Sequence, residues 1–470
     1  MSETYLSAVS MAEDVRQKKI SAVELVEAHL ERIARLNPRL NAFIALDEER
    51  ARRDARDLDA AAAHGAFRGP LHGVPISIKS AIATAGLRCE TGTRLRAGHV
   101  PAKDAVLVSR LREAGAIILG VTNTPELLMS WETDNVLYGR TSNPWDLTRT
   151  AGGSSGGEAA AIAAGCSAGG VGSDGGGSIR VPAHFTGICG LKPTPGRIPS
   201  TGHFPESAGP FALLGVVGPM ARTVADLQLL FEVMAGPDDG DPSSAPVPVR
   251  KIGSQELKQT RIGYFEDDGR TGVTPEIRAA VRTAADALSR AGFEVVPFRP
   301  EGLQEARRLW WKLFGIAGGM VLGPLTKGRE AELSPLLKEY LGWVLAEPAH
   351  TGNSLLETWL RRDAVRNRIL AQMQSFPIVL CPVAAIPAFR HGERSWVVEG
   401  KTVKYFDAWS YTEWFNLLGN PGVAVPVGQS AEGLPIGVQI VGRPWEEELV
   451  LAVAAELERQ CGGFRKPPIE

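Results

Sequence analysis

Glycine is concentrated in residues 150–220, and this segment limits the fold more than any other part of the chain. The chain holds 52 glycines among 470 residues, about one and a half times the usual share of ~7%. Glycine lets backbone segments approach one another or a ligand closely, and it adopts dihedral angles that other residues avoid. We therefore expect closely packed backbone around a binding site in this segment.

The remainder of the chain alternates apolar strands with helices, which indicates an α/β fold. We expect a central mixed, largely parallel twisted sheet covered by helices on both faces. The expected strands are 74–78, 116–121, 261–265, 293–298 and 435–441. One expected helix starts at the capping box of Ser21 and Glu24 and ends at Pro38. Three others span 48–64, 104–114 and 445–459, and a fifth begins at Thr274 and Pro275.

The apolar stretch 309–325 contains Trp310, Trp311, Leu313, Phe314 and Met320. Base rates favour a helix that faces the core over a wall of a substrate site. Residues 236–250 are rich in Gly, Pro, Asp and Ser, which predicts a surface loop.

Composition excludes several classes of protein. Hydrophobic residues make up 44%, charged residues 22%, and the net charge is −2, as in a soluble globular protein without a basic surface for nucleic acid or an anionic membrane. The chain contains no run of 18 apolar residues, so we expect no membrane span. The N-terminus lacks the apolar core of a signal peptide. The five scattered cysteines favour reduced thiols and a cytoplasmic location. The eight histidines have no metal-ligand spacing, so we expect neither a metal nor another cofactor.

The first candidate motif is the segment 150–166, with Ser154 and Ser155 between paired glycines. Ser155 and Glu158 have the spacing of a capping box, so we expect a helix here with Ser155 as its cap and Ser154 just outside its positive end. The segment also fits Gly-x-Ser-x-Gly, but no apolar strand precedes it. A nucleophile elbow requires that strand, so we reject this interpretation.

A second motif places three glycines, Gly175, Gly176 and Gly177, directly before Ser178. Such a backbone can turn several N–H groups toward one point, as an acyl-transfer enzyme needs for the oxyanion of its tetrahedral intermediate. An ordinary glycine loop is the alternative. We expect Asp174 and Arg180 to orient this loop as a structural pair.

The third motif is Lys79, which ends the apolar run 74–78. It is either a lysine whose amine reaches the surface or a desolvated amine whose lowered pKa lets it act as a base. A serine hydrolase without histidine needs another base, and lysine is the usual substitute. The three motifs together predict a base, a relay hydroxyl and a nucleophile beside an oxyanion nest.

The run 150–183 resembles the signature of the amidase signature family of serine hydrolases. The resemblance covers 72–194, including 120–126 and 189–194, and resumes at 218–222 and 434–444. Residues from about 240 to 400 contain no motif that is diagnostic of the family. It implies a single amidase signature domain over 1–470. Its parts would be an N-terminal helical segment at 1–65, a catalytic core at 66–240, a variable αβ insertion on the substrate side at 241–400, and the C-terminal part of the core at 401–470.

This resemblance implies a Ser-cisSer-Lys triad, with Ser178 as nucleophile, Ser154 as bridging serine after a cis peptide bond, and Lys79 as base. The backbone N–H groups of Gly175, Gly176, Gly177 and Ser178 match the oxyanion hole. Similarity to the fatty-acid-amide branch places Leu128, Met129 and Ser130 near the acyl group of the substrate. Ser80 is a departure, since the family commonly has Asp after the catalytic lysine.

The expected activity is hydrolysis of a small-molecule carboxamide with a hydrophobic acyl or aryl group, through an acyl-enzyme. The alternative is the glutaminase subunit of a tRNA-dependent amidotransferase. That branch usually has Gln where this chain has Val181, and its tyrosine-rich C-terminal motif is missing. A non-catalytic amide-binding relative and a metal-dependent hydrolase are further alternatives. A homodimer is the expected assembly.

Overall fold

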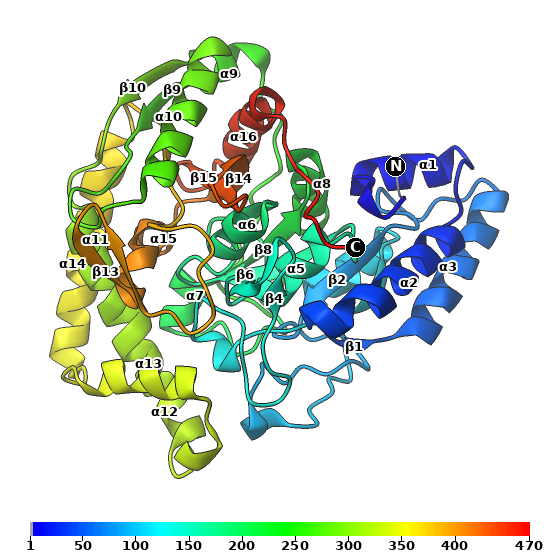
Figure 1. Ribbon diagram of the computed structural model, residues 1–470, viewed down its shortest axis with the longest axis horizontal. Coiled ribbons are helices and arrows are strands. Elements are labelled where there is room, and N and C mark those ends of the chain that lie inside the picture. Colours follow the sequence, from blue (N-terminus) through cyan, green and yellow to red (C-terminus); the bar gives the residue numbers. More distant parts are fainter. Residues whose placement is uncertain (1–2) are drawn as a thin grey trace.

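The computed structural model describes residues 3–470, and an eleven-stranded sheet runs through it (Figure 1). The strand order is β1-β3-β2-β6-β8-β7-β14-β15-β11-β9-β10. The strands are β1 (Phe43–Leu46), β2 (Pro75–Lys79), β3 (Ile117–Thr122), β6 (Gly169–Asp174), β7 (Cys189–Lys192), β8 (Val216–Ala221), β9 (Arg261–Tyr264), β10 (Glu294–Pro297), β11 (Ile378–Pro382), β14 (Gly422–Gln429) and β15 (Pro435–Val441). Two small sheets join β4 (Ser142–Asn143) to β5 (Asp146–Thr150) and β12 (Ser395–Val398) to β13 (Lys401–Lys404).

Helices lie on both faces of this sheet (Figure 1), so the predicted α/β class with a central mixed sheet is confirmed. Parallel pairing joins β3, β2 and β6 on one side and β11, β9 and β10 on the other. The strands from β6 through β8, β7, β14 and β15 to β11 pair antiparallel, so the middle of the sheet is less parallel than expected. Only five residues join β14 to β15, and a connection that short forces an antiparallel pair.

Within residues 3–470 the structure also has sixteen α-helices. They are α1 (Ala8–Arg16), α2 (Ala22–Leu40), α3 (Glu48–Ala63), α4 (Val106–Glu113), α5 (Gly156–Ala163), α6 (Arg180–Thr186), α7 (Pro210–Leu214), α8 (Val224–Met234), α9 (Ser254–Gln259), α10 (Pro275–Arg290), α11 (Leu303–Trp310), α12 (Ala317–Thr326), α13 (Pro335–Leu345), α14 (Gly352–Gln372), α15 (Ser410–Leu418) and α16 (Glu447–Cys461). A π-helical turn, Trp311–Ile316, connects α11 to α12. Within residues 3–470, no helix has the length and apolar character needed to cross a membrane.

The predicted end of the first long helix is wrong. Helix α2 begins at the predicted capping box but continues through Pro38 to Leu40. Proline there removes only one hydrogen bond in the final turn, while Leu36 and Leu40 are fully buried. The segment 1–65, expected to be helical, contains helices α1, α2 and α3 together with strand β1. The four residues of β1 are too few to give a periodic pattern.

The glycine-rich segment forms the middle of the sheet and the helices beside it. Strands β6 and β7 lie within it and β8 begins within it, although glycine is depleted in strands and gave no strand signal. Backbone segments approach closely at these glycines. A Cβ on Gly157 of α5 would lie 2.5 Å from the backbone of Asn123, and one on Gly170 of β6 would lie 1.9 Å from the Glu158 carboxylate. Glycine at these positions lets α5 lie against the sheet, next to the end of β2.

Candidate active site

Lys79 is the last residue of β2, and its side chain is completely buried. Its Nζ lies 2.7 Å from Oγ of Ser154, 2.9 Å from Oγ of Ser155 and 3.0 Å from Oγ of Ser173. Burial lowers the pKa of Lys79 from 10.5 to about 7, although the carboxylates of Asp174 and Glu158 oppose this shift. The interpretation as a lysine that reaches the surface is therefore wrong, because the amine is desolvated within a cradle of serine hydroxyls.

Ser155 does not cap α5 as the sequence predicted. It occupies the N-cap position, but its side chain makes no capping hydrogen bond. Its Oγ faces Lys79 and the backbone N–H of Ser173 instead, at 2.9 and 3.3 Å. The carboxylate of Glu158, expected to complete the capping box, accepts hydrogen bonds from Ser77 and Thr122 of the neighbouring strands. Tertiary partners replaced the local pairing because the start of α5 is packed into the sheet.

Ser154 is buried in the loop before α5, and the Gly153–Ser154 peptide bond is cis, as the resemblance implied. Its position next to Lys79 depends on close backbone packing, since a Cβ on Gly153 would lie 2.7 Å from the backbone nitrogen of Glu132. This loop is tied to the second motif by a hydrogen bond from the N–H of Ser155 to the carbonyl of Ser178, at 3.1 Å.

Ser178 lies in the loop between β6 and α6, after Gly177, whose φ of +113° favours glycine. The predicted oxyanion donors divide into two groups. The N–H of Gly177 donates to Asp174 at 2.7 Å, so it is not available to a substrate. In the part of the chain that the structure describes, the N–H groups of Gly175, Gly176 and Ser178 donate to no protein atom.

Asp174 and Arg180 form a fully buried ion pair with two contacts of 3.0 Å. Burial opposes ionisation of Asp174, but the Arg180 guanidinium and the N–H of Gly177 hold the pKa of this carboxyl well below its ordinary value. Arg180 also donates to Gln439 and Asn416. The pair joins the glycine loop to β15 and α15.

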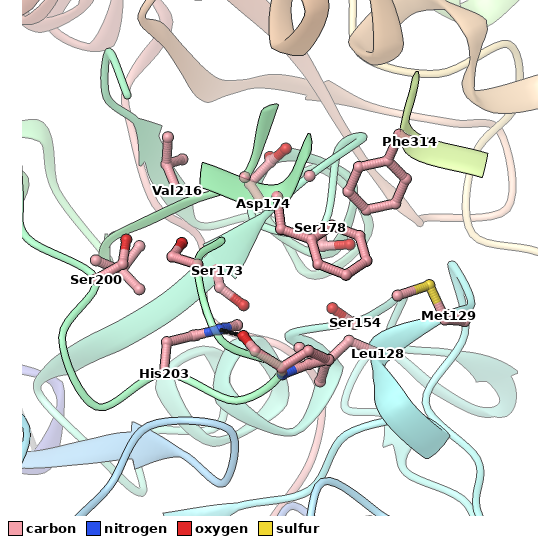
Figure 2. Close-up of a pocket in the computed structure, with 16 residues that line it drawn as sticks. Leu128, Met129, Ser154, Ser173, Asp174, Ser178, Ser200, His203, Val216 and Phe314 are labelled. Atoms are coloured by element: carbon pink, nitrogen blue, oxygen red, sulfur yellow. Dashed lines mark hydrogen bonds between the residues drawn. The ribbon is translucent and has the colours of Figure 1, made fainter. Parts of the chain in front are cut away.

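One cavity of about 490 Å³ contains the proposed nucleophile and the bridging serine (Figure 2). Its wall residues are Leu128, Met129, Ser154, Ser173, Asp174, Gly175, Ser178, Ser200, His203, Pro205, Ser207, Phe211, Gly215, Val216, Val217 and Phe314. Ser130, expected beside the substrate, lies outside this wall because its hydroxyl pairs with the Tyr405 hydroxyl at 2.9 Å.

Several wall residues escaped the sequence analysis. His203, Ser200 and Phe211 lie in loops and a short helix that follow β7, with no motif to mark them. Phe314 was noted only within the apolar stretch 309–325, and both interpretations of that stretch hold in part: Trp310 is buried, and Phe314 faces the cavity. Its apolar character was the only available signal.

Ser80 differs from the residue that the family resemblance implies, and the structure gives it no compensating partner. Its side chain is fully buried, and its Oγ makes no hydrogen bond within residues 3–470. The same described residues contain no group of three or more His, Cys, Asp or Glu side chains arranged to hold a metal ion.

Comparison with known proteins gives consistent matches. The profile of the family named Amidase matches residues 24–451. An acylamidase of Rhodococcus erythropolis is 35% identical, covering 97% of this chain and 95% of its own length. A glutamyl-tRNA(Gln) amidotransferase subunit of Anaeromyxobacter sp. (strain K) is also 35% identical, over 97% of this chain and 96% of its own length. A solved structure of fatty acid amide hydrolase superposes with a TM-score of 0.87, at 28% identity, covering 98% of this chain and 86% of its own.

Proposed function

This chain belongs to the amidase family of hydrolases, and we propose that it cleaves a carboxamide through an acyl-enzyme on Ser178. Lys79 is the base in this proposal and Ser154 is the relay between them. The observation that carries it is the 2.7 Å contact between the buried amine of Lys79 and Oγ of Ser154, since Ser154 lines the same cavity as Ser178.

The first step is a proton relay. Neutral Lys79 takes a proton from Ser154 while Ser154 takes one from Ser178, and Oγ of Ser178 adds to the amide carbonyl. A lysine with a pKa of about 7 is largely neutral at pH 8, as a base must be. Ser155 and Ser173 hold the amine in position through their hydroxyl groups.

The developing oxyanion needs preorganised donors, and the N–H groups of Gly175, Gly176 and Ser178 are the candidates. Such donors typically lower a barrier by about 3 kcal/mol each. Gly177 has a supporting role, because its N–H holds Asp174. The relay then runs in reverse: Ser154 protonates the nitrogen of the leaving group, the C–N bond breaks, and water later hydrolyses the ester on Ser178.

The substrate we propose has a hydrophobic acyl or aryl group. The cavity wall includes the side chains of Leu128, Met129, Phe211 and Phe314, and apolar walls favour apolar ligands. The names acylamidase and fatty acid amide hydrolase, carried by two of the similar proteins, agree with such a substrate. The five cysteines are free thiols, which supports a cytoplasmic setting.

The glutaminase subunit is the competing function, favoured by the 35% identity to the amidotransferase subunit. Glutamine carries an α-ammonium and an α-carboxylate, and burying either group without an opposite charge is costly. The only Asp, Glu, Lys or Arg in the described cavity wall is Asp174, whose carboxylate already pairs with Arg180. The wall therefore favours an uncharged substrate over glutamine.

Labelling with a fluorophosphonate and mapping of the adduct by mass spectrometry tests the proposal. We expect one adduct, on Ser178, and none in Ser178→Ala, whereas Ser207→Ala, a serine of the same wall, should label normally. A panel of amides of graded chain length and aromaticity, with glutamine included, then defines the substrate. An adduct on Ser154 or elsewhere, or amide turnover unchanged in Ser178→Ala, would overturn the mechanism; turnover of glutamine alone would favour the competing function.

A further inference from the structure

His203 lies in the loop between β7 and α7, and its ring is part of the wall that surrounds Ser154 and Ser178. Its Nδ1 lies 2.9 Å from the carbonyl oxygen of Pro205. A carbonyl can only accept, so Nδ1 carries the hydrogen. Its Nε2 is buried and has no hydrogen-bond partner within residues 3–470.

The imidazole ring of His203 is neutral at pH 7. Burial lowers the pKa of His203 to about 4, and the nearby Lys79 amine acts in the same direction. A neutral imidazole protonated on Nδ1 has a lone pair on Nε2. His203 therefore has an unused hydrogen-bond acceptor in the wall of the catalytic cavity, in a place where leaving it unpaired costs free energy.

The cavity wall beside His203 differs from the wall beside Phe314. In Figure 2, Ser154 and Ser178 lie between His203 and Ser200 on the left and Phe314 and Met129 on the right. The right-hand side has the apolar side chains of Phe314 and Met129, while on the left Val216 lies among polar side chains. His203, Ser200 and Ser207 also line a second cavity, whose wall includes the charged or polar residues Arg96, His99, Glu206 and Asp241.

A substrate with an apolar acyl group would place that group against Leu128, Met129 and Phe314. Its nitrogen must remain within reach of Ser154, the proton donor to the leaving group. The nitrogen and its substituents then face the polar side, where His203 lies and where the second cavity begins.

We propose that Nε2 of His203 accepts a hydrogen bond from an N–H of the scissile amide, and so selects amides that carry this hydrogen over esters. This inference rests on the proposed function. Once the nitrogen becomes tetrahedral, a bond from its N–H to His203 turns its lone pair away from the imidazole and toward Ser154. His203 would thus position the nitrogen for protonation, while the proton itself still comes from Ser154.

The test compares two substrates with the same acyl group, phenylacetamide and methyl phenylacetate. His203→Phe and His203→Leu replace the imidazole with an apolar side chain of similar size and so remove the acceptor. His203→Gln supplies an acceptor oxygen again. In the Phe and Leu variants we expect kcat/KM for the amide to fall about tenfold, as for one lost hydrogen bond. For the ester it should change less than twofold, because an ester has no N–H to donate. His203→Gln should recover most of the loss.

Equal losses on amide and ester would assign His203 a structural role and overturn the proposal, as would unchanged amide turnover in both the Phe and the Leu variants. Fluorophosphonate labelling separates this failure from failure of the proposed function. If wild type and variants label at Ser178 while the amide-to-ester ratio stays constant, only the role of His203 is refuted. If the wild-type chain does not label at Ser178, the proposed mechanism itself fails.

Discussion

The proposed role of Lys79 as the base, together with its burial, predicts the pH dependence of amide hydrolysis. An ordinary lysine with a pKa of 10.5 is only about 0.3% neutral at pH 8, whereas one with a pKa of about 7 is about 90% neutral. Desolvation therefore raises the fraction of competent base about 300-fold at this pH. We expect kcat/KM to rise about tenfold per pH unit below pH 7 and to level off above it.

The measurement is kcat/KM for one amide between pH 5 and 9, with Ser178→Ala as the blank. Glu158 needs a control, because burial raises its pKa to about 7 as well. Its carboxylate favours the charged form of Lys79, so Glu158→Gln should move the rising limb to lower pH. The amine assignment also predicts that the midpoint falls on warming, as the pKa of an amine does and that of a carboxylic acid scarcely does.

Three results would refute this reasoning. A midpoint near pH 10 would mean that Lys79 is not desolvated in solution. A flat profile would mean that no group titrating near neutrality acts as the base. Loss of the rising limb in Glu158→Gln would assign the titration to the carboxylate.

Other substitutions probe the surroundings of the site. Ser80→Ala removes a buried hydroxyl without a partner and should leave the free energy of unfolding unchanged or slightly higher, as urea denaturation would measure. Arg180→Met leaves the Asp174 carboxylate buried without its ion pair and should lower that free energy by about 3–5 kcal/mol. Gly176→Ala places a Cβ 2.5 Å from the indole of Trp310, which must displace the loop and lower kcat for amides.

For each of these three substitutions, one outcome would contradict the prediction. A loss of stability in Ser80→Ala would reveal a partner for its hydroxyl, and a fully stable Arg180→Met protein would show that the ion pair is not needed to hold the loop. For Gly176→Ala, wild-type kcat would mean that the loop and Trp310 adjust without moving the oxyanion donors.

Some site residues could be predicted because their signals are local. Lys79 ends an apolar strand, which is an unusual place for a charge, and Ser178 directly follows three glycines. The motif resemblance supplied the cis bond before Ser154, which the structure has. The roles of the three residues stay predictions, but the contact between Lys79 and Ser154, 75 residues apart, agrees with them.

The predicted capping box of Ser155 and Glu158 is wrong, and the reason is physical. The spacing of Ser155 and Glu158 satisfies the rule for a capping box, yet neither side chain caps the helix. Lys79, Ser77 and Thr122 are far away in the sequence and offer stronger partners to these two buried groups. A local rule is reliable where the helix end is exposed, as at Ser21 and Glu24 of α2, and unreliable where the helix end is buried.

Periodicity, glycine content and motif order were sufficient on their own to determine the α/β class and to propose the segments that hold the nucleophile, the relay and the base. Each of these signals lies within a short stretch of chain. The tertiary structure decided what surrounds them. It gave Lys79 its lowered pKa, since desolvation depends on atoms from several elements, and it engaged the N–H of Gly177 with Asp174. It also brought His203 and Phe314 to opposite sides of Ser154 and Ser178, because residues from distant loops and helices share a cavity only after the chain has folded.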